Sequence, residues 1–292
     1  MANQAITPSP RFYLGKRASS SITRWFAFVV LCSGSILALL PVLWMMSTSL
    51  KASGDVLLVP PRWIPHPLLW SNYVTALTAQ PFALYYRNTV TYAFLAVVGE
   101  TFSSAMVAYA LARLRGPGHR LFFLIILSTM MLPWQVTLIP QFLLFRALGW
   151  VDSILPLVVP TYFGSAFFIF LLNQFYLTIP DEMDDAARID GASDYQIFWR
   201  IILPMSGPAL ATVAIMSFMY HWNNFLGPLL YLSSKEKLVI SVALQRFTGA
   251  YGATRWDLLM AASLVALLPC VLLFFFAQRY FIQGIVVSGL KG

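Results

Sequence analysis

The stretch from Ile179 to Pro204 reads IPDEMDDAARIDGASDYQIFWRIILP. Within it, the segment from Asp181 to Asp194 holds six of the eleven Asp and Glu residues of the 292-residue chain. Long apolar segments lie on both sides of the stretch. Because a lipid bilayer cannot hydrate so many carboxylates, the segment must lie in water or against a water-soluble partner. The pattern predicts a polar loop between two membrane-spanning helices.

The same stretch predicts two short helices separated by a tight turn. Pro180 suits the first turn of a helix, and the acidic residues after it place negative charge at the positive end of the helix dipole. Gly191 occupies the position at which a left-handed residue ends a helix. Ser193 and Gln196 match a capping box, so a second helix is expected to begin there. Its apolar stripe consists of Tyr195, Phe198, Trp199 and Ile202.

The composition of the whole chain indicates an all-α, polytopic membrane protein. Hydrophobic residues make up 59% of the chain and charged residues only 10%, whereas soluble domains have roughly 25% charged residues. Six apolar segments reach the length of about 20 residues that a membrane-spanning helix needs. They cover approximately residues 25–47, 88–111, 121–145, 154–176, 208–232 and 258–282. We therefore predict six transmembrane helices.

The distribution of basic residues predicts the orientation in the membrane. Six spans put both termini on one side, and the short link from Arg113 to Arg120 on that side is rich in Arg. Since Lys and Arg are enriched in cytoplasmic links, we expect both termini in the cytoplasm. Residues 1–24 are then a cytoplasmic N-terminal tail, residues 25–292 form the membrane domain, and the acidic stretch is cytoplasmic.

Several classes of function are not expected. Cys32 and Cys270 lie inside apolar segments and the three His residues are scattered, so we expect neither a disulfide framework nor a metal site. The net charge of +8 is spread among links, without the basic cluster that nucleic-acid binding requires. The chain contains no Gly-x4-Gly-Lys-Ser/Thr run and no His-Glu-x-x-His pattern, so we expect that it does not itself hydrolyse ATP or catalyse a reaction.

Two groups of polar residues inside the predicted spans are candidates for lining a transport pathway. Glu100 is the only acid well inside a span, and an intramembrane acid is costly to bury. Alternatively, Glu100 is neutral or paired and faces a partner subunit, with Ser103 and Ser104 nearby. The second group is His221, Trp222, Asn223 and Asn224. Trp and Asn suit a sugar ligand, but Asn also joins membrane helices by hydrogen bonds.

The acidic stretch resembles the EAA loop of ABC-importer permeases. The likeness rests on Asp185-Ala-Ala-Arg-Ile-Asp-Gly-Ala192 and on the ending Ile202-Leu-Pro204. This chain has Asp185 where the family usually has Glu, a shorter acid with the same charge. Further matches are Ala108-Tyr-Ala-Leu-Ala-Arg113, Trp222-Asn223, Gln283-Gly284 and Gly289-Leu-Lys-Gly292. From about residue 25 to residue 292, the chain resembles the smaller permease of carbohydrate-type importers related to the maltose system.

The resemblance implies a type I ABC-importer permease fold with a coupling loop at about residues 178–207. In that family the loop docks in a cleft of a cytoplasmic ATPase, and closure of the ATPases on ATP switches the permease from inward-open to outward-open. The implied docking residues are Asp185, Ala186, Ala187, Asp190, Gly191, Ala192 and Pro204. The implied C-terminal contact with the ATPase comprises Gly289, Leu290, Lys291 and Gly292.

The expected function is that of a permease subunit in an ATP-driven importer of a carbohydrate or related polyol. The implied partners are a second, homologous permease, two ATPase subunits that bind ATP and Mg, and an extracytoplasmic solute-binding protein. This chain itself is expected to hold no cofactor. Three alternatives stay open: an ordinary amphipathic loop without a partner, an ion-coupled secondary transporter, and an intramembrane enzyme. A secondary transporter would need internal repeats and buried sites for a coupling ion.

Overall fold

A computed structural model describes residues 16–114, 116–249 and 254–289. These residues form α-helices joined by short links, several of which are single turns of 3₁₀ helix. The helices are α1 (Lys16–Ser49), α2 (Ser71–Thr78), α3 (Phe82–Arg113), α4 (His119–Thr129), α5 (Trp134–Ala147), α6 (Leu155–Val158), α7 (Ala166–Tyr176), α8 (Glu182–Ile189), α9 (Asp194–Ile197), α10 (Leu203–Met205), α11 (Gly207–Asn223), α12 (Leu226–Tyr231), α13 (Ile240–Leu244) and α14 (Trp256–Gly289). The prediction of an all-α fold is confirmed.

The described helices provide up to six membrane spans, two of which are sharply bent, and the fifth covers residues 194–223 and not the predicted 208–232. Four helical segments are long and apolar enough to cross a membrane, namely Thr23–Ser49, Phe82–Arg113, Leu155–Tyr176 and Trp256–Gln278. Two further pairs qualify if each bent pair is one span: α4 with α5, bent by 94°, and Asp194–Met205 with α11, bent by 78°. The chain is a multi-pass membrane protein.

Proline explains why two predicted spans are not continuous helices. The expected span 121–145 breaks at Pro133, which precedes α5 and has no N–H to continue the hydrogen bonds of α4. The expected span 208–232 ends as α11 at Asn223, and Asn224 is extended. Pro228 cannot donate to the Asn224 carbonyl, which instead accepts a hydrogen bond from Ser241 Oγ at 2.7 Å.

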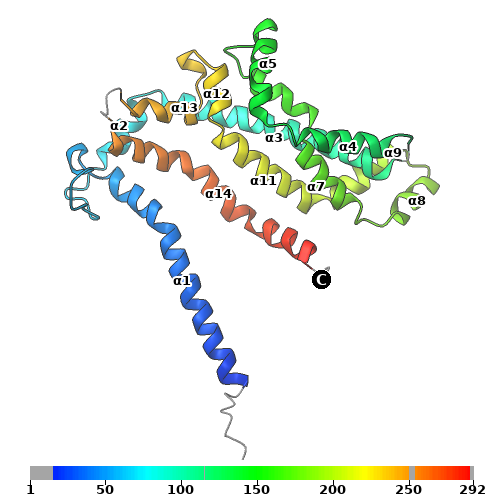
Figure 1. The fold of residues 1–292 in the computed structure, drawn as a ribbon, viewed down its shortest axis with the longest axis horizontal. Helices are drawn as coiled ribbons and strands as arrows, with labels where there is room; N and C mark the ends of the chain where they lie inside the picture. Colours follow the sequence, from blue (N-terminus) through cyan, green and yellow to red (C-terminus); the bar gives the residue numbers. More distant parts are fainter. Residues whose placement is uncertain (1–15, 115, 250–253, 290–292) are drawn as a thin grey trace, which may run out of the picture.

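The helices other than α1 pack together into one body, and helix α3 lies at its centre. In Figure 1 it runs from α2 and α13 at one end to α8 and α9 at the other, with α7 and α11 beside it. Small residues on α3, among them Ala93, Ala96, Ala105 and Ala108, are completely buried and let its neighbours approach closely. Gly99 is the tightest point, because a Cβ there would lie 2.4 Å from the ring of Tyr162.

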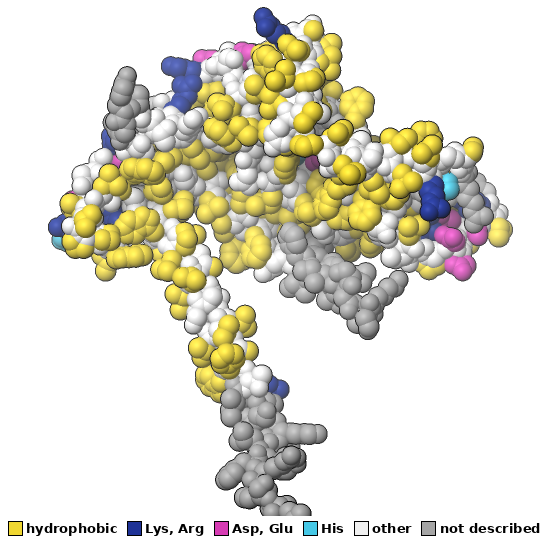
Figure 2. Space-filling model, viewed as in Figure 1, with side chains coloured by type: hydrophobic (Ala, Val, Ile, Leu, Met, Phe, Trp, Pro, Cys, Tyr) yellow, Lys and Arg dark blue, Asp and Glu magenta, His cyan; other side chains and the backbone are white. Residues whose placement is uncertain are grey.

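The two ends of the body differ in chemistry. Helix α1 extends away from the body and meets α14 only near the end that carries α2 (Figure 1). Figure 2 shows hydrophobic side chains along α1 and along the sides of the body, with acidic side chains gathered beside α8. The link 51–87 and the described part of the next long link, residues 233–249 and 254–257, lie at the opposite end from α8, where Asn72 donates to the carbonyls of Ser49 and Lys51. The polar helix α8 and these two links therefore lie at opposite ends of the molecule.

Asp152 joins two links at the end that carries α2. Its carboxylate accepts hydrogen bonds from the backbone N–H groups of Ser233 and Ser234, both at 2.9 Å, and from Lys237 Nζ at 3.0 Å. The hydroxyl of Ser234 donates to the same carboxylate at 2.5 Å. These hydrogen bonds, with that hydroxyl contributing most, hold the pKa of Asp152 well below the ordinary carboxyl value.

Candidate functional site

The acidic stretch forms two short helices around a glycine turn, as its sequence predicts. Helix α8 carries Glu182, Asp184 and Asp185 in its first turn. Gly191 has φ of +82° and its N–H donates to Arg188 O at 3.0 Å, so it ends α8 in the left-handed conformation that suits glycine. Pro180 was expected in the first turn of this helix. It lies two residues before the helix instead, because α8 begins at Glu182.

The second helix begins where it was expected, but it is longer than the short helix that was predicted. Ser193 and Gln196 form both hydrogen bonds of the capping box, which begins α9. The chain then continues through a π-helical turn, Phe198–Ile202, into α10. Pro204 lies in the first turn of α10 and does not end the helix; the sharp bend comes at Ser206. Of the predicted apolar stripe, Phe198 and Ile202 are buried, whereas Tyr195 and Trp199 remain exposed.

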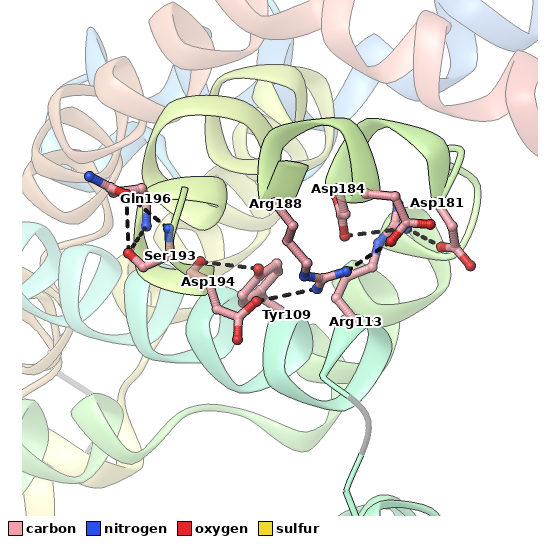
Figure 3. A network of polar contacts seen from close by, with 9 residues as sticks. Tyr109, Arg113, Asp181, Asp184, Arg188, Ser193, Asp194 and Gln196 are labelled. Carbon is pink, nitrogen blue, oxygen red and sulfur yellow. Dashed lines mark hydrogen bonds and ion pairs between the residues drawn. The ribbon is translucent and has the colours of Figure 1, made fainter. Parts of the chain in front are cut away.

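Arg113, the last residue of α3, holds α8 in position (Figure 3). Its Nη2 donates to the carbonyl of Ile179 at 2.6 Å, and its Nη1 donates to the carboxylate of Asp181. The same Nη1 lies 3.7 Å from Asp184 Oδ2. The side chains of Arg113 and Asp184 are 2% and 4% exposed, so this ion pair is shielded from water. The end of α3 and the start of α8 are therefore joined by buried charge.

A second connection lies one turn earlier on α3. Tyr109 Oη donates to the carbonyl of Asp194 at 3.1 Å, which ties α3 to the first residue of α9. Arg188 bridges the two short helices, because it lies 3.2 Å from both Asp185 and Asp194 (Figure 3). Arg188 is exposed, so these two pairs contribute little to stability. The α8–α9 unit is thus attached to α3 chiefly through Arg113 and Tyr109.

Asp184 is the buried acid of this unit, whereas the other acidic residues between Asp181 and Asp194 are exposed. Its burial raises its pKa above the ordinary carboxyl value, although the nearby charges of Arg113 and Arg188 act in the opposite direction. Its Oδ1 is buried and has no hydrogen-bond partner among the described residues. Asp184 therefore depends on Arg113 for its principal compensation.

The predicted docking residues do not all face outward. Those that are exposed are Asp185, Ala186, Asp190, Gly191 and Pro204. Ala187 is buried against the membrane helices and Ala192 is half-buried. The small side chain of Ala187 thus permits close packing within this subunit. Ile189, to which the sequence analysis assigned no role, is 87% exposed.

A cavity of about 640 Å³ lies between α3, α5, α6, α11 and α12. This volume is within the range of small-molecule binding sites. Apolar and aromatic side chains form much of the wall, including Trp134, Leu138 and Leu226. The polar part of the lining includes Tyr92, Glu100, Gln141, Thr161, Tyr220, His221, Asn223, Asn224 and Tyr231. Three of the predicted pathway residues, Glu100, Asn223 and Asn224, are therefore brought together at one cavity.

Trp222, the fourth predicted pathway residue, does not line this cavity. Its indole Nε1 donates to the carbonyl of Ala266 in α14 at 3.1 Å, and its ring stacks on Phe218 with 5.2 Å between centroids. Successive residues of a helix point about 100° apart. Trp222 consequently faces α14, whereas Tyr220 and Asn223 face the cavity.

Glu100 is paired within this subunit. Its Oε2 accepts hydrogen bonds from Ser217 Oγ at 2.6 Å and from His221 Nε2 at 3.1 Å. The hydroxyls of Ser103 and Ser104, the expected neighbours, instead bond backbone groups. Sequence reasoning missed Ser217 because it lies on a different span. Among the described residues, no group of three or more His, Cys, Asp and Glu side chains is arranged to hold a metal ion.

The C-terminal residues of the predicted ATPase contact are only partly visible. Gly289 is the last residue of α14. Leu290, Lys291 and Gly292 lie outside the described residues.

Comparison with known proteins identifies the family. Residues 103–287 match the family model described as "Binding-protein-dependent transport system inner membrane component". The arabinooligosaccharides transport system permease protein of Halalkalibacterium halodurans is 34% identical over 280 residues, covering 95% of this chain and all of the relative. The sn-glycerol-3-phosphate transport system permease protein of Yersinia enterocolitica is 35% identical over 270 residues, covering 90% of this chain and 96% of the relative.

Solved structures agree with this match. A chain of a bacterial ABC transporter involved in the import of the acidic polysaccharide alginate has a TM-score of 0.80 and 26% identity, covering 94% of this chain and all of that chain. A second alginate transporter structure, in complex with a periplasmic protein, has a TM-score of 0.64 at 18% identity and covers 90% of this chain and 96% of that chain, which supports the fold. These relatives favour an ABC importer over an ion-coupled secondary transporter. The chain belongs to the family of binding-protein-dependent transport system inner membrane components and is a permease subunit of an ABC importer.

Proposed function

We propose that this subunit forms half of the translocation pathway for a carbohydrate or related polyol, and that it is moved by a cytoplasmic ATPase that docks on α8. Its partners are a homologous second permease, two ATPase subunits that bind ATP and Mg, and an extracytoplasmic solute-binding protein. Both termini and the coupling loop are cytoplasmic. The relatives named for arabinooligosaccharides and sn-glycerol 3-phosphate support a substrate of this kind.

The observation that carries the proposal is the way α8 is held. Its outer side presents Asp185, Ala186 and Asp190 to solvent, together with the large apolar side chain of Ile189. An exposed apolar side chain surrounded by acidic and small residues suits an apolar pocket with a basic rim on a protein partner. The opposite side is bonded to α3 through Arg113. A partner that grips α8 would therefore pull on α3.

Helix α3 carries such a movement into the membrane. Glu100 lies thirteen residues before Arg113, and a rise of 1.5 Å per residue separates them by about 20 Å along the helix. Glu100 and Tyr92 line the cavity. The end of α3 that meets α8 and the part that borders the cavity belong to one continuous helix. Displacement of α8 would thus reshape the cavity, which is the coupling that an ATP-driven importer needs.

The remaining regions have complementary roles in this proposal. The links at the opposite end, residues 51–87 and 233–257, receive the solute-binding protein. Gly289, the last residue of α14, and the residues from Leu290 to Gly292 contact the ATPase next to the coupling loop. Residues 1–24 form the cytoplasmic tail, and residues 25–292 form the permease domain.

Gly191 provides the test of coupling. Its φ of +82° is closed to proline, and proline also removes the N–H that donates to Arg188 O. Asparagine tolerates positive φ, so Gly191→Asn is the matched control. In the assembled complex, Gly191→Pro is expected to abolish most of the ATP hydrolysis that the loaded binding protein stimulates, while Gly191→Asn retains it. Membrane insertion of both variants is checked by protease accessibility. If a correctly inserted Gly191→Pro complex hydrolyses ATP and transports like the control, the proposed coupling role is wrong.

A further inference from the structure

The cavity contains an ordered chain of hydrogen bonds that ends on a carboxylate. Asn224 Nδ2 donates to Tyr92 Oη at 3.1 Å, and Tyr92 Oη is 3.0 Å from His221 Nδ1. His221 Nε2 is 3.1 Å from Glu100 Oε2. With Nε2 as the donor, Nδ1 accepts from Tyr92, so every donor in the chain has one acceptor. The chain orients the Glu100 side chain through residues of α3 and α11 and the extended residue Asn224 that follows α11.

The arrangement leaves one carboxylate oxygen for a ligand. Both side-chain donors, Ser217 and His221, reach Oε2. No described residue donates to Oε1. The Glu100 side chain is 13% exposed and belongs to the cavity wall. It can therefore accept a hydrogen bond from a hydroxyl group that enters the cavity.

The rest of the lining suits polyhydroxylated ligands and not anions. Gln141 and Asn223 supply amide donors and acceptors, and Trp134 and Tyr220 supply aromatic surface. None of the described residues that line the cavity is Lys or Arg. Proteins recognise phosphates and carboxylates with charge-assisted donors, most often from Arg or Lys. An anion entering this cavity would meet a carboxylate without a compensating basic side chain from this subunit.

We propose that this half of the pathway selects uncharged polyhydroxylated substrates, such as neutral oligosaccharides, and excludes anions such as phosphate esters and uronates, with Glu100 as the residue that sets this selectivity. The inference rests on the proposed function, because it assumes that the cavity belongs to the translocation pathway. This selectivity would distinguish the substrate of this chain from the anionic substrates that the names of two relatives specify, sn-glycerol 3-phosphate and the acidic polysaccharide alginate.

Thiol-reactive probes of opposite charge test the inference directly. Leu226 lines the cavity and is 52% exposed, so Leu226→Cys offers a labelling site that is not one of the polar groups. It is made in the complete transport complex in a background carrying Cys32→Ala and Cys270→Ala. The rates at which a cationic and an anionic methanethiosulfonate modify this cysteine are measured with and without ATP. Each rate is divided by the rate of the same reagent with a small thiol in solution, which corrects for the intrinsic reactivity of the reagent.

The expected result is a cationic-to-anionic ratio above about 10, because a nearby carboxylate in a poorly screened cavity attracts one reagent and repels the other. Glu100→Gln is expected to lower the ratio at least fivefold. Glu236→Gln removes the same charge from an exposed residue outside the cavity and is expected to leave the ratio unchanged.

The possible contrary results are distinguishable. A ratio near one, or a ratio that Glu100→Gln does not change, overturns the selectivity inference while the cavity remains a water-filled pathway. Failure of both reagents to react, with and without ATP, shows that the cavity is closed to water and overturns the pathway proposal as well.

Discussion

Replacing Arg113 with methionine tests whether α3 and the coupling loop move as one unit. Methionine replaces the aliphatic part of the side chain and removes its charge and all its donors. Asp184 would then be a buried acid without its principal partner. Removal of one member of a buried ion pair costs about 3–5 kcal/mol. The lower end applies here, because the separation of 3.7 Å is longer than a direct hydrogen bond.

A cost of about 3 kcal/mol corresponds to a change of roughly 100-fold in an equilibrium constant. The loss concerns local opening of α8, so hydrogen exchange is the appropriate assay. The reporting amide groups are those of Asp190, Gly191 and Ala192, which donate to carbonyls within the α8 turn. In purified complex, these groups are expected to exchange roughly 100-fold faster in Arg113→Met than in the unmodified protein.

Two further variants show whether the charge argument is right. Arg188→Met makes the same substitution on an exposed arginine, whose pairs are worth at most about 1 kcal/mol, and should change exchange less than about sixfold. Asp184→Asn added to Arg113→Met removes the uncompensated acid and should restore at least tenfold of the lost protection. The reasoning is refuted if Arg113→Met exchanges no faster than Arg188→Met, or if adding Asp184→Asn restores nothing.

Further predictions concern the packing of α3, the link at Asp152, and the two residues already proposed for coupling and selectivity. Gly99→Ala should lower the melting temperature of the complex, since its Cβ would lie 2.4 Å from the Tyr162 ring. Combining it with Tyr162→Ala should recover most of that loss. An unchanged melting temperature in Gly99→Ala would contradict the close contact. Because the folded-state pKa of Asp152 is lowered, its contribution to stability is fully present above the ordinary carboxyl pKa and is lost as the pH falls toward the folded-state value. The melting temperature gap between unmodified protein and Asp152→Asn should therefore be larger at pH 7 than at pH 3, and a constant gap would count against the hydrogen-bonded carboxylate. Gly191→Pro should uncouple ATP hydrolysis, and Glu100→Gln should weaken the preference of the cavity for cations, as described above.

Local features were predictable because they depend on neighbours in the sequence. The six apolar segments are long enough to span a bilayer whatever they pack against. Gly191 ends α8, and Ser193 with Gln196 begins α9, through hydrogen bonds made within a few residues. The family likeness at Asp185 to Ala192 depends on the same short run of sequence.

Features that join distant segments were not predictable in this way. The bend between α4 and α5 follows from Pro133, but proline within α5 and within α14 is accommodated in the helix, so proline alone does not predict a break. Helical rotation decides that Asn223 lines the cavity while Trp222 faces α14. Neither outcome can be obtained without knowing which helices are adjacent.

The sequence by itself determined a multi-pass helical protein with a polar helix–turn–helix loop, because hydrophobic length and local capping require only the chain nearby. The tertiary structure alone decided that Arg113 holds this loop and that His221 and Ser217 orient Glu100. These contacts join residues 66 to 121 positions apart. In a membrane protein such pairings form when helices pack, since a buried charge must find its partner on whichever neighbouring element lies within reach.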